Sequence, residues 1–184
     1  MSNYDLPTSI EINNNVYPIR NKGDYRVVLD VIATLNDDEL TELEKSTCAL
    51  YVFYQDVSTI KEEDYPEAIN QCFNFISYGV NDKNNKDYKL MDWDYDFPIY
   101  IAPINRVLGL EIRAVKYLHW FTFLSAYMEI GECSFQFVVG IREKLAKGKK
   151  LEKYEKEFIE ENENLVYFGS KYTEEEKALL DSIK

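Results

Sequence analysis

The chain has 184 residues, of which 46% are hydrophobic and 15% aromatic. This apolar content supports one folded domain with a hydrophobic core and excludes a disordered chain. The 33 acidic and 21 basic residues give a net charge of −12, which argues against binding to nucleic acid or to an anionic membrane. Residues 1–100 hold 19 acidic against 8 basic side chains (−11), and residues 101–184 hold 14 against 13 (−1). We therefore expect a protein partner.

Two short apolar segments predict a β-hairpin within residues 1–22. The segments at residues 10–12 and 16–19 flank a run of three asparagines, and Asn tolerates the left-handed backbone of a tight turn. Pro18 has no amide hydrogen to donate, so we expect the second strand to lie at a sheet edge.

Apolar residues at helical spacing predict three helices in residues 23–79. We expect Asp24 to cap the first helix, Asn36 and Glu39 to form a capping box for the second, and Pro66 to begin the third. The residues that we expect on buried faces are Val27, Val28, Val31, Ile32 and Leu35 in the first helix, Leu40, Leu43, Thr47, Leu50, Tyr51 and Tyr54 in the second, and Ile69, Cys72, Phe73 and Ile76 in the third.

The middle of the chain combines a polar loop with the most apolar helix. Residues 79–96 are rich in Asn, Lys and Asp and predict a long acidic surface loop. Helix returns at Phe97, with a kink expected at Pro103 because proline donates no hydrogen bond to the preceding turn. Residues 117–131 are apolar over most of their circumference and predict the central helix of the core.

The C-terminal part predicts three further helices. One covers residues 135–148, and a polar, exposed helix covers residues 152–163. A capping box at Thr173 predicts a last short helix in residues 170–184 that extends free of the body. The fold class is therefore mainly α: residues 1–184 form a single compact helical domain of about six or seven helices with a short N-terminal β-hairpin.

One segment raises the question of a metal site. From Asp92 to Asp96, aspartates alternate with aromatic residues, as carboxylates do at the start of a calcium loop of the EF-hand type. That loop also needs Gly at its sixth and Glu at its twelfth position, where this chain has Phe97 and Pro103. We therefore interpret the segment as a solvated acidic loop whose last residue, Asp96, caps the next helix.

No residue pattern indicates catalysis. His119 is the only histidine, which excludes a multi-histidine metal site, and we interpret it as a hydrogen-bonded residue of the core or of a helix end. The seven glycines do not have the spacing of a phosphate-binding loop. We expect a protein that is not an enzyme, with no catalytic residue, no cofactor and no metal.

The cysteines and the N-terminus indicate the cytoplasm. Cys48, Cys72 and Cys133 lie far apart and are interpreted as reduced, buried, small hydrophobic residues. The first residues have neither the basic segment nor the apolar run of a secretory signal. The most apolar stretch, residues 118–130, is too short to span a membrane.

Residues 142–156 hold seven basic and three acidic side chains and form the only basic stretch. Two interpretations stay open. The stretch is a solvated helix end, where lysine is favourable, or it is a contact for an acidic or helical partner.

Three segments carry a resemblance to a known family. They run from Asp24 through Arg26 to Leu29, from Asp96 to Gly109 and from Leu118 to Gly131, with Ile141-Arg142 downstream. These segments resemble the bacteriophage gp-fifteen family, encoded by phages and prophages of Gram-positive bacteria. Phe121 stands where family members often have a second Trp. The resemblance implies structural core roles for the motif residues Asp24, Arg26, His119, Trp120 and Arg142.

The resemblance also implies a function. Genes of this family usually lie just ahead of the tape measure gene, where long-tailed phages encode their tail assembly chaperones. We therefore expect a non-catalytic chaperone that binds the tape measure protein in the host cytoplasm during tail morphogenesis and is absent from the mature virion. The tail tube protein is a further candidate partner, and a homo-oligomer stays open. The alternative is a structural virion component, such as a tail completion or head-tail connector protein. The partner-binding surface is not identified.

Overall fold

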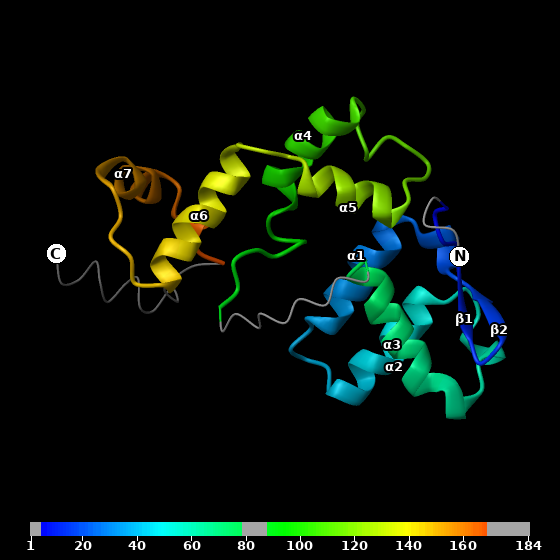
Figure 1. Ribbon diagram of the computed structural model, residues 1–184. Coiled ribbons are helices and arrows are strands. Elements are labelled where there is room, and N and C mark those ends of the chain that lie inside the picture. The colour runs from blue at the N-terminus through cyan, green and yellow to red at the C-terminus, as the bar shows by residue number, and fades with distance from the viewer. Residues whose placement is uncertain (1–4, 79–87, 169–184) are drawn as a thin grey trace. The chain divides into compact units, whose positions relative to one another are not determined.

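The computed structural model describes residues 5–78 and 88–168 (Figure 1). The described chain is mainly helical with an N-terminal hairpin, as predicted, and contains eight α-helices. Its backbone contacts group into two compact units. Of the described residues, the first unit contains 5–78 and 101–130, and the second contains 88–100 and 131–168. The expectation of a single domain stays a prediction.

The N-terminal hairpin pairs β1 (Ser9–Ile12) with β2 (Asn15–Pro18) in antiparallel register. Ile12 is opposite Asn15, so the turn consists of Asn13 and Asn14. Their φ angles are 49° and 63°, the left-handed conformation that Asn tolerates better than most residues. The hairpin prediction is therefore confirmed.

The first helix, α1 (Tyr25–Leu35), begins where the sequence predicts it. The Asp24 carboxylate accepts a hydrogen bond from the Arg26 amide, which makes Asp24 the N-cap. Val27, Val28 and Val31 are buried on one face of the helix, as expected from their spacing.

The second helix, α2 (Glu42–Phe53), starts later than predicted, and the capping box expected at Asn36 and Glu39 is wrong. Thr41 and Glu44 form the box instead, because each side chain accepts from the backbone amide of the other residue. The Glu39 amide donates to the Asp37 carboxylate in the turn before the helix. Two overlapping box patterns occur in this segment, and only the later one continues into helix.

The buried faces of α2 and α3 (Tyr65–Ile76) differ from the predicted ones. In α2, Leu43 is 78% and Tyr51 59% exposed, while Leu50 is buried. In α3, Phe73 is 43% exposed, while Cys72 is buried. The neighbours that are buried instead are Ala49, Phe53, Ala68 and Phe75. Both helices have more apolar positions than one face can hold, so the predicted buried faces were partly wrong.

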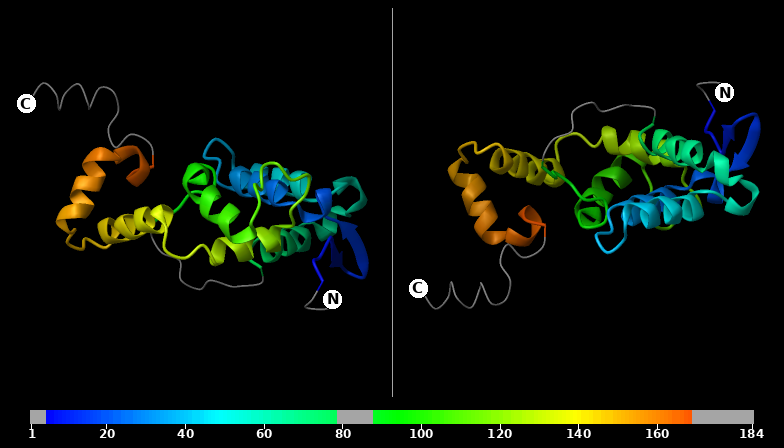
Figure 2. Two further views of the ribbon diagram at one scale, coloured as in Figure 1. Left: turned by 90° about the horizontal axis from the view of Figure 1, so that it is seen from above. Right: turned by 90° about the horizontal axis from the view of Figure 1, so that it is seen from below.

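Helix α2 packs against both α1 and α3, and β1 contacts α3 (Figures 1 and 2). The remaining helices of the first unit are the later part of α4 (Phe97–Leu108), which contains Pro103, and α5 (Trp120–Met128). Helix α5 begins three residues later than predicted and contacts α1. The ring of Phe123 stacks on Tyr25 with centroids 4.7 Å apart, which fixes α5 against α1.

The second unit contains the first residues of α4 together with α6 (Ser134–Ala146), α7 (Lys153–Glu161) and α8 (Glu163–Val166). Phe137 of α6 contacts the rings of Tyr154 and Phe158 of α7, with centroids 6.1 and 5.0 Å away. Aromatic contacts of this kind hold the two helices together. The short α8 follows directly after α7 and was not predicted.

Two predicted features fall partly or wholly outside the described residues. Of the predicted loop 79–96, only residues 88–96 are described, and they form turns before α4. The predicted helix in residues 170–184 lies outside the described residues, as does its capping box. None of the helices in residues 5–78 and 88–168 has both the length and the apolar character needed to cross a membrane.

Candidate functional site

The motif residues of the first unit gather around the buried carboxylate of Asp24, which is 4% exposed. One carboxylate oxygen accepts from the Arg26 amide, and the other accepts from the Leu118 amide, both at 3.0 Å. The Tyr25 amide donates back to the Leu118 carbonyl at 2.9 Å. The Asp24 region thus joins the start of α1 to the chain segment just before α5.

Arg26 extends this connection to the loop that precedes α5. Its guanidinium lies 3.2 Å from the Asp24 carboxylate and donates to the carbonyls of Ile112 and Val115 at 3.1 and 2.7 Å. A guanidinium has several donors in a fixed plane, so it can bind a carboxylate and two carbonyls at once. Arg26 therefore holds the loop of residues 109–119 in place.

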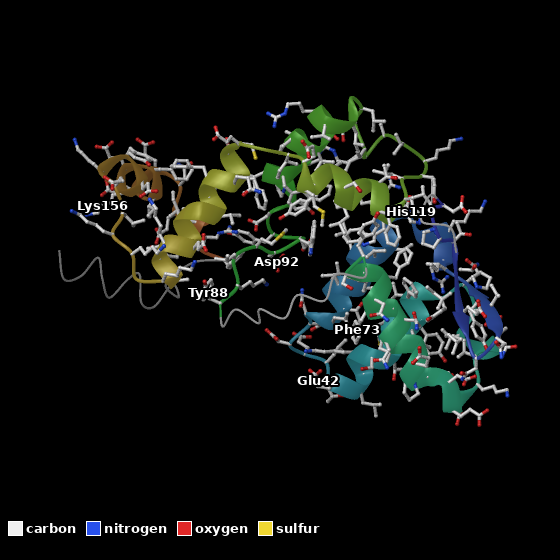
Figure 3. All side chains as sticks on the ribbon, viewed as in Figure 1. Glu42, Phe73, Tyr88, Asp92, His119 and Lys156 are labelled. Carbon is white, nitrogen blue, oxygen red and sulfur yellow. The ribbon has the colours of Figure 1, made fainter. Side chains whose placement is uncertain are left out.

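His119 is 2% exposed and is the N-cap of α5 (Figure 3). Its Nδ1 accepts from the Phe121 amide, and its Nε2 lies 3.0 Å from the Pro7 carbonyl. This geometry requires the tautomer with hydrogen on Nε2, which donates to Pro7. Burial lowers the pKa of the imidazole, although the Pro7 carbonyl and Asp24 oppose the shift. The neutral His119 side chain therefore links the N-terminal segment to the start of α5 through these two hydrogen bonds.

The surroundings of His119 leave no room for a larger residue at Gly23. The glycine has a φ of +76°, and a Cβ added there would lie 2.9 Å from the Phe75 ring and 3.2 Å from Nε2 of His119. Glycine is required at position 23 both for the backbone conformation and for the space.

Trp120, the next motif residue, is 1% exposed, and its indole nitrogen donates to the Ile76 carbonyl at 3.0 Å.

The second unit is built around a buried ion pair between Asp96 and Arg142, whose side chains are 1% and 3% exposed. Two hydrogen bonds of 2.7 and 2.8 Å join the carboxylate to the guanidinium. The same guanidinium donates to the carbonyls of Leu90, Leu165 and Val166 at 3.0, 2.6 and 2.9 Å. Arg142 therefore links α6 to the segment before α4 and to α8.

Asp96 directly precedes α4, as predicted, and its carbonyl accepts from the amides of Ile99 and Tyr100, but the expectation that it is solvated is wrong, because its carboxylate is buried and bound to Arg142. It also accepts from the Asp92 amide at 2.9 Å. The Asp92 carboxylate in turn accepts from the amides of Asp94 and Tyr95 and pairs with Lys89. Partial burial is the largest single influence on the pKa of Asp92 and raises it, but the hydrogen bonds from Lys89, Tyr95 and Asp94 and the charge of Lys89 together outweigh burial and lower the pKa. Backbone amides and cations of the chain thus bind the carboxylates of Asp92 and Asp96.

The basic stretch 142–156 separates into a buried part and an exposed part. Arg142 lies in the core of the second unit, and Lys144 pairs with the buried Glu155 at 2.7 Å. Lys147 pairs with Glu143 one turn earlier in α6. Lys149, Lys150 and Lys156 are exposed. The exposed positive charge of the stretch therefore lies at its C-terminal end.

The cysteines differ in their surroundings. Cys72 is buried, and burial raises the pKa of its thiol to about 12. Cys133 is partly buried, but Cys48 is exposed on α2, so the expectation that all three are buried was wrong. Within residues 5–78 and 88–168, no group of three or more His, Cys, Asp and Glu side chains is arranged to hold a metal ion.

A shallow groove of about 370 Å³ lies between β1 and α3. The described residues that line it are Pro7, Ser9, Ile10, Glu11, Gln71, Asn74 and Phe75.

The polar residues named by the sequence motifs thus meet in two separate clusters. Asp24, Arg26 and His119 join in the first unit, and Arg142 joins Asp96 in the second. Their hydrogen bonds go mainly to backbone groups of distant segments, which is how polar side chains hold loops and helix ends in place. The sequence analysis did not predict Asp96 as a core residue, although one of the segments that carry the family resemblance begins at Asp96.

Comparison with known proteins identifies one family. The family model described as Bacteriophage Gp15 protein matches residues 3–167. No curated protein matches the chain. No solved structure matches it either.

Proposed function

Because the chain belongs to the Bacteriophage Gp15 protein family, we propose that this phage protein is a tail assembly chaperone. In this role it binds the tape measure protein in the host cytoplasm during tail morphogenesis and leaves before the virion is complete. It catalyses no reaction and uses no cofactor. The tail tube protein is a second partner, which displaces the chaperone as the tube grows.

The observation that carries the proposal is the exposure of large apolar side chains on the helices of a strongly acidic chain. In the first unit Leu43, Tyr51 and Met128 are 78%, 59% and 63% exposed, and in the second unit Tyr154 is 57% exposed. A tape measure protein is a long helical rod with apolar faces that aggregate when left bare. Exposed apolar side chains on helices supply the surface that such faces need. The net charge of −12 would keep a complex of many copies soluble.

The geometry of the two polar clusters favours a non-catalytic role. Both ring nitrogens of His119 are engaged with backbone groups, and the Asp96 carboxylate is engaged with Arg142. A general base or nucleophile must reach a substrate, and these groups are turned towards the chain itself. This supports a structural role for them within a binding protein.

Co-expression with the tape measure protein tests the proposal. We expect the tape measure protein to remain soluble and to co-purify with this chain, and to precipitate when the chain is left out. An L43S/Y51S/M128S variant, which alters only exposed side chains, should stay folded but lose part of this solubilising effect. A tape measure protein that is equally soluble without the chain, and that does not bind it, would overturn the proposal.

A further inference from the structure

Helix α2 presents an apolar line to solvent that is bordered by acidic residues. Leu43, Thr47 and Tyr51 are spaced four residues apart, so they lie along one face of the helix, and all three are exposed. Leu43 and Tyr51 are about 12 Å apart along the helix axis, at 1.5 Å per residue. We call this line the α2 ridge.

The border of the α2 ridge is acidic. Its exposed carboxylates are Asp37, Asp38, Glu39, Glu42 and Glu44. The nearest lysine in the sequence, Lys45, is partly buried and pairs with Glu42 at 3.3 Å. At the other end of the ridge, Arg20 donates to the carbonyls of Tyr51, Val52 and Tyr54 and is thereby engaged with the last turn of α2. The Leu43 end therefore carries a strong negative charge.

The second unit presents a surface of opposite character, which we call the α7 patch. It consists of Lys149, Lys150, Lys153, Tyr154 and Lys156, which are all exposed, and the exposed Glu152 and Glu157 lie in the same stretch, so its four lysines outnumber its two exposed carboxylates. Tyr154 is 57% exposed, yet its ring is held by stacking on Phe137. Lys153 pairs with Glu157 at 3.4 Å, which leaves the other lysines to supply most of the positive charge. Figure 3 labels Glu42 on α2 and Lys156 on α7, one from each surface.

We propose that the α2 ridge of one molecule binds the α7 patch of a second copy of this chain. The two surfaces match in charge, because a rim of carboxylates would meet a cluster of lysines. They also match in apolar content, because Leu43 and Tyr51 would contact the Tyr154 ring, which stacking on Phe137 keeps in place. The chain itself therefore supplies both halves of the contact.

The two surfaces are different, so the contact joins unlike faces of identical molecules. Such a heterologous contact leaves a free ridge on one molecule and a free patch on another, which allows further copies to add until a ring closes or a chain forms. This self-association does not depend on the tape measure protein. It would line up many copies and leave exposed apolar side chains outside the contact, such as Met128 of α5, to meet the rod.

Light scattering coupled to size-exclusion chromatography of the full chain tests the contact over a series of protein concentrations. We expect an average mass above that of one chain, which rises with concentration and falls when salt is raised from about 50 mM to about 500 mM. The patch variant K150Q/K156Q and the ridge variant L43S/Y51S should each weaken association about tenfold, because exposed ion pairs and apolar contacts are individually modest.

Mixing the two variants gives the sharper result. The patch variant keeps an intact ridge and the ridge variant keeps an intact patch, so the mixture should form a complex of one copy of each. K61Q/K116Q, which removes two exposed lysines elsewhere, should associate like the unaltered chain. A chain that stays monomeric at every concentration, or association that both variants retain, would overturn the proposal. Failure of the mixture to recover a complex would do the same.

Discussion

The buried ion pair between Asp96 and Arg142 gives the most specific prediction about stability. Asp96→Ala removes the carboxylate and leaves the Arg142 guanidinium buried with three carbonyl partners but without a counter-charge. The loss of one member of a buried pair typically costs about 3–5 kcal/mol, which is a large part of the roughly 5–15 kcal/mol that stabilises a domain. We therefore expect the second unit to unfold far more readily in this variant.

The assay is urea denaturation combined with amide hydrogen exchange resolved by peptide. Exchange should accelerate in α6 and α8, which Arg142 connects, while peptides from α1 and α5 change little. Asp96→Asn keeps the shape of the side chain and one acceptor oxygen, so its loss of stability should be smaller than that of the alanine variant.

A double-mutant cycle separates the pair from its surroundings. Asp96→Ala combined with Arg142→Met should cost less than the sum of the two single substitutions, by about 2 kcal/mol or more. Asp94→Asn, on an exposed residue of the same turn, is the matched control and should change stability by less than about 0.5 kcal/mol. Strictly additive effects, or an Asp96→Ala variant as stable as this control, would refute the assigned role of the pair.

Four other predictions concern the first unit. His119→Ala should be less stable than His119→Asn, because Asn restores the N-cap acceptor, and the difference is measurable by thermal unfolding. Burial lowers the pKa of His119 in the folded state, so the unfolded state binds the proton more readily. The free energy of unfolding should therefore fall as the pH drops below about 6.5, the ordinary pKa of histidine. His119→Asn should make the free energy of unfolding less dependent on pH in this range. Gly23→Ala should cost about 1–3 kcal/mol in urea, whereas Gly109→Ala, also at positive φ but with open space around it, should cost less. Thr41→Ala should cost about 1 kcal/mol, and Asn36→Ala much less, because only Thr41 caps α2.

Local sequence signals predicted the elements well where one signal dominated. The run of asparagines predicted the β-turn, and Asp24 followed by a valine-rich face predicted α1, because turn and cap residues act on their nearest neighbours. The start of α2 was misplaced because Asn36 with Glu39 and Thr41 with Glu44 have the same pattern. Only the structure shows which of the two is used.

Which helix faces are buried and which charges pair depends on tertiary contacts, and the spacing of residues along the sequence does not reveal these contacts. Leu43, Tyr51 and Phe73 have the spacing of core residues but are exposed, because other apolar residues of the same helices face the core. Asp96 resembled a loop carboxylate because its partner, Arg142, lies 46 positions away in the sequence. The family motifs indicated which residues matter, and the structure supplies the physical reason.

The most direct test of the proposed function follows this chain through tail assembly by quantitative mass spectrometry. We expect it to co-purify with the tape measure protein from infected or induced cells that lack the tail tube protein. It should be absent from purified, finished particles of the same phage. The chain at stoichiometric levels in those particles would contradict the chaperone role and would identify it as a structural component of the virion.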